Sequence, residues 1–194
     1  MKKLIFLSLF LIFSCSSDNE SDNSCTPVAC LNGGTPTTDC GCDCPEGFSG
    51  SDCSVKLTPT SVSITKIDIK KFPDSYNGDW WDTFPSNSDA DIYFTIQNPS
   101  ETEIYNGLNE LGFFEDASGL NEIYPFTLSP PLTITNVTGN HILILYDEDL
   151  DLDDYVSLLV FKPYNASLSG FPSTYTVNNP PNTFECDFTV EYTW

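Results

Sequence analysis

Apolar and polar residues alternate along the C-terminal end of the chain with the period of a β-strand. The apolar positions of this run are Phe184, Cys186, Phe188, Val190, Tyr192 and Trp194. Such alternation predicts a strand with one buried face. It places Cys186 in the core as a small buried thiol, with a reactive or intermolecular cysteine as the alternative. Other apolar runs, separated by clusters of Pro, Gly and Asn, predict strands at 62–69, 92–97, 132–135, 141–146, 156–161, 174–177 and 184–192.

No segment of residues 55–194 has a convincing helical period, and the spacing of the predicted strands is typical of a β-sandwich. These residues are numerous enough for one independent core. We therefore expect an all-β domain over residues 55–194.

The N-terminal residues have the pattern of an export signal. Lys2 and Lys3 precede an apolar stretch at 4–13. This stretch is too short to span a bilayer, which takes roughly 20 residues, but it is typical of a signal peptide. We assign residues 1–14 to that signal. The ending LIFSC at 11–15 resembles the lipobox of bacterial lipoproteins, which implies that Cys15 is acylated and anchors the chain to the outer membrane. An ordinary cleaved signal is the alternative.

Residues 15–24 contain the polar and acidic run SSDNESDNS. A segment without apolar residues cannot bury enough surface to fold, so we expect a flexible tether after the lipidated cysteine. An acidic stretch in this place resembles the surface-export signal of Bacteroidetes lipoproteins, which implies a location on the cell surface.

Six cysteines lie within residues 25–54, and spacing alone does not choose among their possible pairings. Such a density predicts an exported, disulfide-stapled module, because cytosolic thiols are kept reduced. The run 42–53, CDCPEGFSGSDC, closely resembles the end of an EGF-like domain. That resemblance implies the disulfides Cys25–Cys40, Cys30–Cys42 and Cys44–Cys53. It also favours a rigid spacer or protein-contact surface without a calcium site.

Acidic residues dominate the charge of the chain, with 28 Asp and Glu against 7 Lys and Arg and a formal net charge of −21. A surface of this sign excludes nucleic acid as a partner, because no basic patch can neutralise phosphates. The acids gather at 147–154, between two predicted strands, and at 74–91, before another. Carboxylates on loops suit calcium, which takes six to eight oxygen ligands. Solvated acidic loops are the alternative.

The order of strands and acids resembles a C2 domain, an eight-stranded calcium-binding β-sandwich. In that family an Asp on one loop is followed by a second Asp that leads into a strand, and a later loop carries D-x-D and a further Asp. Here the loop at 77–82 is longer than in the family, and the later loop is one residue short. The resemblance implies calcium ligands at Asp74, Asp91, Asp147, Asp149 and Asp154, with Asp82, Asp89 and Asp153 as further candidates.

The sequence offers little support for catalysis. The single histidine has no plausible nucleophile arrangement, and no Gly-rich loop precedes a helix. We expect a non-catalytic, lipid-anchored surface protein with calcium-dependent binding or adhesion to a protein, glycan or anionic-lipid partner, with Trp80 and Trp81 as candidate contact residues. One alternative is a carbohydrate-binding module with only structural calcium. Another is a spacer that presents the EGF-like module.

Overall fold

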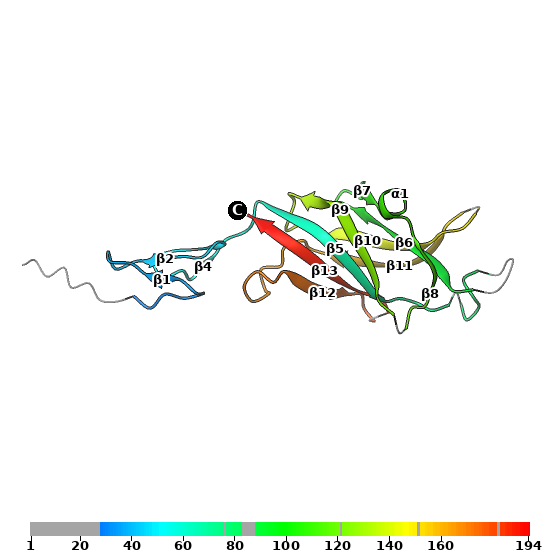
Figure 1. The fold of residues 1–194 in the computed structure, drawn as a ribbon, viewed down its shortest axis with the longest axis horizontal. Coiled ribbons are helices and arrows are strands. Elements are labelled where there is room, and N and C mark those ends of the chain that lie inside the picture. The colour runs from blue at the N-terminus through cyan, green and yellow to red at the C-terminus, as the bar shows by residue number, and fades with distance from the viewer. Residues whose placement is uncertain (1–27, 76, 83–87, 121, 151, 182) are drawn as a thin grey trace, which may run out of the picture.

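The structure of the protein is a computed structural model that describes residues 28–75, 77–82, 88–120, 122–150, 152–181 and 183–194. The predicted signal peptide, Cys15, the tether and Cys25 lie outside these ranges. The described chain has two parts: an N-terminal module, residues 28–56, and a β-sandwich, residues 57–194 (Figure 1).

The sandwich consists of two antiparallel sheets, which confirms the predicted all-β class. The five-stranded sheet has the order β11-β10-β6-β7, with β8 also paired to β6. Its strands are β6 (Ala90–Gln97), β7 (Glu103–Asn106), β8 (Phe114–Ala117), β10 (His141–Asp147) and β11 (Asp154–Phe161). The four-stranded sheet has the order β12-β13-β5-β9, formed by β5 (Ser61–Lys71), β9 (Tyr124–Ile134), β12 (Thr174–Asn178) and β13 (Glu185–Thr193).

Two short strands of the first sheet, β7 and β8, together fill one position beside β6. β8 pairs with the start of β6 and β7 with its end, both on the side away from β10. Between them lies the short helix α1 (Gly107–Leu111), whose N-cap Asn106 accepts a hydrogen bond from the Asn109 backbone N–H at 3.1 Å. The nine described strands of the sandwich therefore fill eight strand positions. The sequence analysis did not predict β7, α1 or β8.

Strand β9 is longer than the predicted strand at 132–135. Its interior contains Pro130 and Pro131, which cannot donate to a ladder and so argue against a strand. β9 tolerates them because it is the edge strand of its sheet, and the register against β5 shifts between Ile64 and Lys66.

The core lies between the two sheets and is built from alternating positions. Phe94 of β6, Leu143 of β10 and Phe188 of β13 are fully buried. Each such side chain contributes about 1.5–3 kcal/mol when it leaves water. Cys186 is buried, as its place in the alternation predicts, and it forms no disulfide within the described ranges. Burial raises the pKa of the Cys186 thiol, which disfavours the reactive thiolate.

The N-terminal module is held together by disulfides and short strand pairs. β1 (Thr35–Pro36) pairs with β2 (Cys42–Asp43), and β3 (Phe48–Ser49) pairs with β4 (Val55–Lys56). The disulfides Cys30–Cys42 and Cys44–Cys53 are two of the three pairs that the EGF-like resemblance implies. Cys40 is also disulfide-bonded. The partner implied for it, Cys25, lies outside the described residues.

The module packs directly against the sandwich through aromatic rings. Phe48 meets Phe171 edge-on, with ring centroids 5.3 Å apart, and Phe171 meets Trp194 in the same way at 4.9 Å. The Lys56 ammonium lies 4.9 Å from the Phe171 ring centroid and donates to the Leu168 carbonyl at 2.8 Å. These contacts join the two parts without a free linker.

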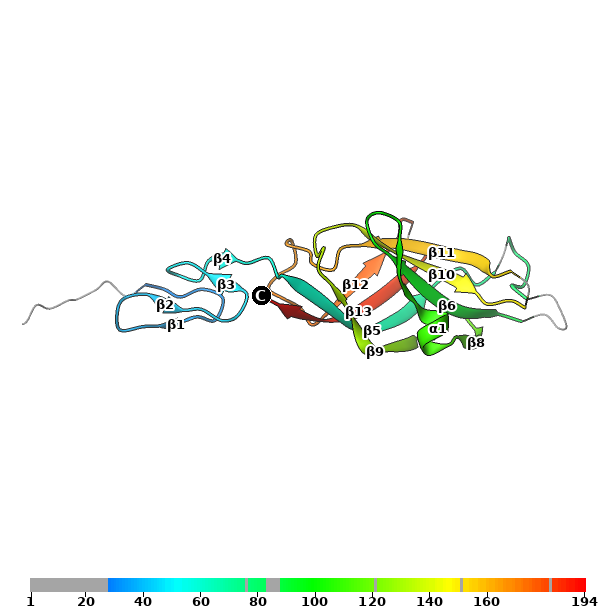
Figure 2. The ribbon, with the colours of Figure 1, turned by 90° about the horizontal axis from the view of Figure 1, so that it is seen from above.

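The molecule is elongated, and its two ends differ. Figures 1 and 2 both place the module at one end and the loops that follow β5 and β10 at the other. No helix among the described residues is long and apolar enough to cross a membrane.

Replacing Gly47 by Ala should loosen the module from the sandwich. Gly47 has φ +84°, and an added Cβ would meet the Phe171 ring and lie 2.7 Å from Trp194 Cζ2. Gly33→Ala is the matched control, because Gly33 has φ +85° with nothing within 4 Å of the added carbon. Both variants carry the left-handed strain of roughly 1–2 kcal/mol.

Thermal unfolding and limited proteolysis distinguish the clash with the Phe171 and Trp194 rings from the backbone strain that both variants share. We expect Gly47→Ala to lower Tm further than Gly33→Ala and to open the junction near residue 57 to protease. Equal effects of the two variants would show that the module does not depend on the ring contact.

Candidate functional site

Both groups of acidic residues predicted as calcium ligands lie at the end of the sandwich remote from the module. β5 ends and β6 begins at this end, and β10 ends where β11 begins. Antiparallel pairing of β10 with both β6 and β11 sets Asp147 opposite Ile92 and Asp154. Carboxylates more than 50 residues apart in sequence therefore come together. We call this region the acidic end, defined by residues 74–75, 77–82, 88–91, 116–119, 147–150 and 152–154.

Asp147 is the most buried carboxylate of the acidic end. It is 0% exposed, and its Oδ1 accepts a hydrogen bond from the Asp91 backbone N–H at 2.6 Å. Its Oδ2 is buried and has no hydrogen-bond partner among the described residues. Burial raises the pKa of Asp147 to about 7. Repulsion from the carboxylates of Asp82, Asp149 and Asp91 adds to this rise. A buried charge with an unpaired oxygen is costly unless a cation or a proton compensates it.

Asp82 and Asp149 surround this buried group. Burial raises the pKa of Asp82, with a further rise from repulsion by Asp91, and Asp82 accepts a hydrogen bond from the Ser88 hydroxyl. Burial likewise raises the pKa of Asp149, with repulsion from Asp82 next. The structure thus brings Asp82, a secondary candidate in the sequence, into the centre of the acidic end.

Asp74 and Asp89 lie to one side of this centre. Asp74 Oδ1 accepts from the Gly119 backbone N–H at 2.8 Å and from the Ser118 hydroxyl at 3.2 Å. Burial raises the pKa of Asp89, and repulsion from Asp74 adds to the rise. Asp74 is therefore held by the segment after β8 and lies near enough to Asp89 to repel it, whereas Asp82 repels Asp147.

The acids at the start of β11 have separate roles. Asp153 accepts hydrogen bonds from the Tyr93 hydroxyl and from the Asp149 backbone N–H, so both of its oxygens have partners. Asp154 opens β11, is exposed, and repels Asp149. Of these two alternatives, Asp154 is the one whose oxygens have no hydrogen-bond partner in the described part of the chain.

The chemistry of the acidic end fits a hard cation. All of its charged groups that could bind a metal ion are carboxylates, and calcium prefers carboxylate oxygens as ligands. Within the described residues, no group of three or more Asp, Glu, His or Cys side chains is arranged to hold a metal ion.

Apolar side chains stand exposed beside these acids. Leu150 is fully exposed, Leu152 is 84% exposed, and Trp80 is 51% exposed. Trp80 also lines a hollow of about 280 Å³ together with Asp74 and Asp89. The two candidate contact residues differ, because Trp81 is not exposed as Trp80 is. It is buried and donates from Nε1 to the Pro73 carbonyl at 3.1 Å, so it packs under its own loop.

Three residues of this end were missed in the sequence. The Asp116 backbone N–H donates to Asp91 Oδ1 at 2.8 Å, and the Asp116 carboxylate contributes to the raised pKa of Asp82 and Asp89. Asp116 lies in β8, a strand that the sequence analysis did not predict. Leu150 and Leu152 alternate with aspartates in the printed sequence, and that alternation in a loop was the available signal.

The raised pKa of Asp147 predicts an unusual pH dependence of stability. The folded pKa is about 7 and the ordinary value is 3.8, so between these pH values the folded state binds the extra proton. The free energy of unfolding should therefore fall as pH rises from about 4 to 7, by at most about 4 kcal/mol. Asp147→Asn should make this fall much smaller, leaving the contributions of Asp82, Asp89 and Asp149, whose pKa values are also raised, and should stabilise the protein at pH 8 in EDTA.

Urea unfolding at pH 5 and pH 8 measures this difference. Glu191→Gln, an exposed carboxylate of β13, is the control and should leave the pH dependence unchanged. If Asp147→Asn were less stable than the unaltered chain at pH 8 in EDTA, the buried Asp147 charge would not be destabilising, and the prediction would be wrong.

No family model matches the chain, and no curated protein sequence matches it. Solved structures that match include human GIVD cytosolic phospholipase A2 with methyl gamma-linolenyl fluorophosphonate inhibitor and terbium chloride. That match has 19% identity and a TM-score of 0.41, and covers 70% of this chain and 18% of the other. The same human enzyme with methyl gamma-linolenyl fluorophosphonate matches at 19% identity and a TM-score of 0.36, over 69% and 17% of the two chains. The chain thus spans less than a fifth of the length of these structures.

Proposed function

We propose that the chain is a non-catalytic, lipid-anchored protein of the outer cell surface, and that its C2-like sandwich binds calcium at the acidic end and a partner through the same loops. The buried Asp147 carboxylate carries this proposal. Its Oδ2 has no hydrogen-bond partner in the part of the chain that the structure describes, and three further carboxylates lie near enough to raise its pKa. A solvated acidic loop would instead keep its carboxylates in water.

The proposed ligands are those at the centre of the acidic end: Asp82, Asp91, Asp147, Asp149 and Asp154. Calcium would supply the positive charge that offsets their mutual repulsion. The Asp91 and Asp147 backbones are fixed in paired strands, whereas Asp82 and Asp149 lie on loops. The loop residues are therefore the ones that move, and they approach a fixed pair.

The exposed Leu150, Leu152 and Trp80 supply the proposed contact with a partner. These side chains stand beside the acids, so drawing the loops together also sets their spacing. The net charge of −21 repels anionic surfaces, so a phosphate-bearing surface would be bound only with calcium present. Because the acidic end lies opposite the module, a chain anchored through Cys15 would present these loops away from its own membrane.

Thermal unfolding of the whole chain in calcium and in EDTA tests the proposal. Calcium at 100 times its dissociation constant adds about 2.7 kcal/mol, so Tm should rise by several degrees. The double variant Asp147→Asn, Asp149→Asn should lose this rise.

The matched control is Asp39→Asn with Glu191→Gln, which removes two exposed acids elsewhere and changes the net charge equally. This control should keep the full rise of Tm. If the Tm of the unaltered chain does not rise at millimolar calcium, the calcium site is refuted. If both double variants lose the rise of Tm equally, the rise comes from relief of general charge repulsion and not from a specific site.

A further inference from the structure

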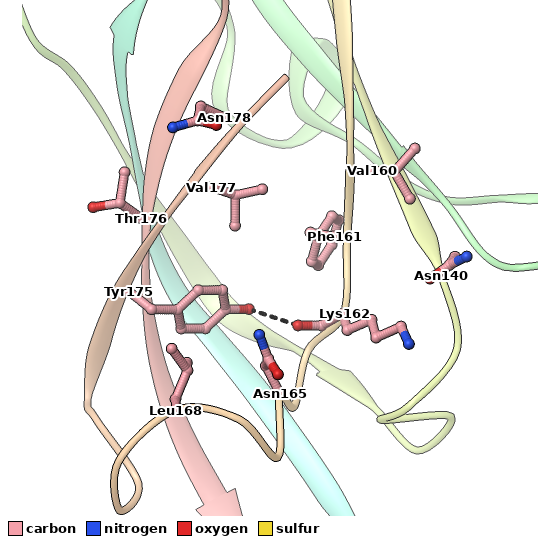
Figure 3. Close-up of a pocket in the computed structure, with 10 residues that line it drawn as sticks. All are labelled: Asn140, Val160, Phe161, Lys162, Asn165, Leu168, Tyr175, Thr176, Val177 and Asn178. Carbon is pink, nitrogen blue, oxygen red and sulfur yellow. Dashed lines mark hydrogen bonds between the residues drawn. The ribbon is translucent and has the colours of Figure 1, made fainter. Parts of the chain in front are cut away.

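The outer face of the five-stranded sheet, turned away from the core, is apolar along β10 and β11. Directly opposed residues of antiparallel strands share a face, and the register sets Ile142 opposite Val160 and Ile144 opposite Leu158. Val160 lies on the opposite side of β11 from Phe161, whose side chain is buried (Figure 3). In the single chain, Val160 is 49% exposed and Leu158 is 37% exposed. We call this face the outer patch, formed by Ile142, Ile144, Tyr146, Tyr155, Leu158 and Val160.

The outer face of the four-stranded sheet is polar, in contrast to the outer patch. β13 presents Asp187 and Thr189 on that face, directly opposite Asp68 and Lys66 of β5. Antiparallel sheets with one solvated face normally place polar residues on it, and the four-stranded sheet follows this rule. The outer patch departs from it, and a contiguous apolar surface of this kind marks an interaction site.

Charged residues of opposite sign border the outer patch at its two ends. Lys162 directly follows β11 at the end nearer the module, is exposed, and lies on the same side of β11 as Val160 (Figure 3). Within the described ranges, Lys162 takes part in no ion pair. At the other end Glu148 follows β10, and Asp153 accepts a hydrogen bond from the Tyr93 hydroxyl on the same face. Between the two ends, no residue of the outer patch is charged.

We infer that the outer patch binds the outer patch of a second copy of the chain, with the strands of the two copies antiparallel. A twofold axis that crosses the strands at right angles lays β11 of each copy over β11 of the other. Lys162 of each copy then approaches Glu148 and Asp153 of the other, so the pair has two such charge contacts. The apolar residues between these contacts are covered.

The antiparallel orientation also separates the acidic ends of the two copies. Each copy has a formal net charge of −21, which opposes association. Antiparallel strands set the two acidic ends roughly 25 Å apart, about three times the Debye length of about 8 Å in about 0.15 M salt. Their mutual repulsion is therefore largely screened, whereas a parallel pair would bring the two acidic ends together.

The size of this face fits a weak and reversible pair. β11 has 8 residues. Such a strand spans about 27 Å and four strand positions span about 19 Å, so each copy covers roughly 500 Å². The total of roughly 1,000 Å² is at the low end of specific interfaces, where transient complexes lie. We therefore expect a dissociation constant in the micromolar range.

The outer patch is poorly suited to a sugar or to an anionic membrane. The aliphatic side chains in its middle offer no hydrogen bond to sugar hydroxyl groups. The single ammonium of Lys162 does not offset a net charge of −21 against a phosphate-bearing surface. A second copy, in contrast, matches both the apolar middle and the opposite charges at the two ends.

Antiparallel pairing directs the N-terminal modules of the two copies away from each other, since each module lies at the end remote from the acidic end. Two chains anchored on facing surfaces would therefore pair, whereas neighbours on one surface would not. This consequence rests on the proposed lipid anchor, but the pairing in solution does not.

Sedimentation velocity of the full chain at about 1 to 200 µM, in EDTA and about 0.15 M salt, tests the pairing. We expect an equilibrium between monomer and dimer that shifts to dimer as the concentration rises. Val160→Lys should weaken the pairing at least about ten-fold, because it sets two ammonium groups into the apolar contact. Tyr155→Lys repeats the test at a second exposed position, and the Tm of each variant verifies that it folds.

Thr174→Lys is the matched control for these variants. Thr174 is exposed on β12, an edge strand of the other sheet, and the substitution adds the same charge. It should not weaken the pairing.

Two further measurements test the orientation of the pair. Lys162→Gln should weaken the pairing about three-fold or more, because it removes both charge contacts. Lys66→Gln changes the net charge equally on the other sheet, where Lys66 pairs with Asp68, and should have a smaller effect. Beads that carry the chain by its N-terminus should cluster through antiparallel pairs, and beads with Val160→Lys should not.

A monomer at every concentration, an equal loss of pairing in Val160→Lys and Thr174→Lys, or a dimer in solution that does not cluster the beads would each overturn the inference. The calcium proposal does not share this failure, since it predicts a rise of Tm with calcium, whereas the pairing is measured in EDTA.

Discussion

The pairing of β6 with β10 is the constraint on which the acidic end depends. It sets Asp147 opposite Ile92, so that the Asp91 backbone N–H reaches the buried Asp147 carboxylate. Neighbouring residues of the same two strands, including Phe94 and Leu145, fill the core. The burial of these side chains stabilises the pairing by several kcal/mol, and the pairing in turn holds one carboxylate out of water. An electrostatically unfavourable group is thus kept in place by apolar packing.

The alternation of apolar residues was sufficient to predict the class of the fold and most of its strands. It failed where another physical term outweighed local preference. The prolines of β9 lie on an edge, where a missing donor costs little, and the short strands β7 and β8 have too few residues to show a period. The helix α1 has five residues, which is below the length at which a helical pattern can be recognised.

The candidate site was predictable in its location but not in its detail. The resemblance to a C2 domain grouped the acids near 91 and 147, and the antiparallel pairing of β6 with β10 brings them together. Which acids stand at the centre depends on loop conformation, and the sequence does not show that Asp82 approaches Asp149 while Asp74 turns to Gly119.

Strand β5 connects the two ends of the molecule and has a mechanical consequence. The module runs directly into Ser61 at the start of β5, and Lys71 at its end leads into the acidic end. β5 is paired along its length with β13 on one side and β9 on the other. A pull between the two ends would act along β5, perpendicular to its hydrogen bonds. These bonds would share the load and be sheared together, so the sandwich is built to resist tension between its two ends.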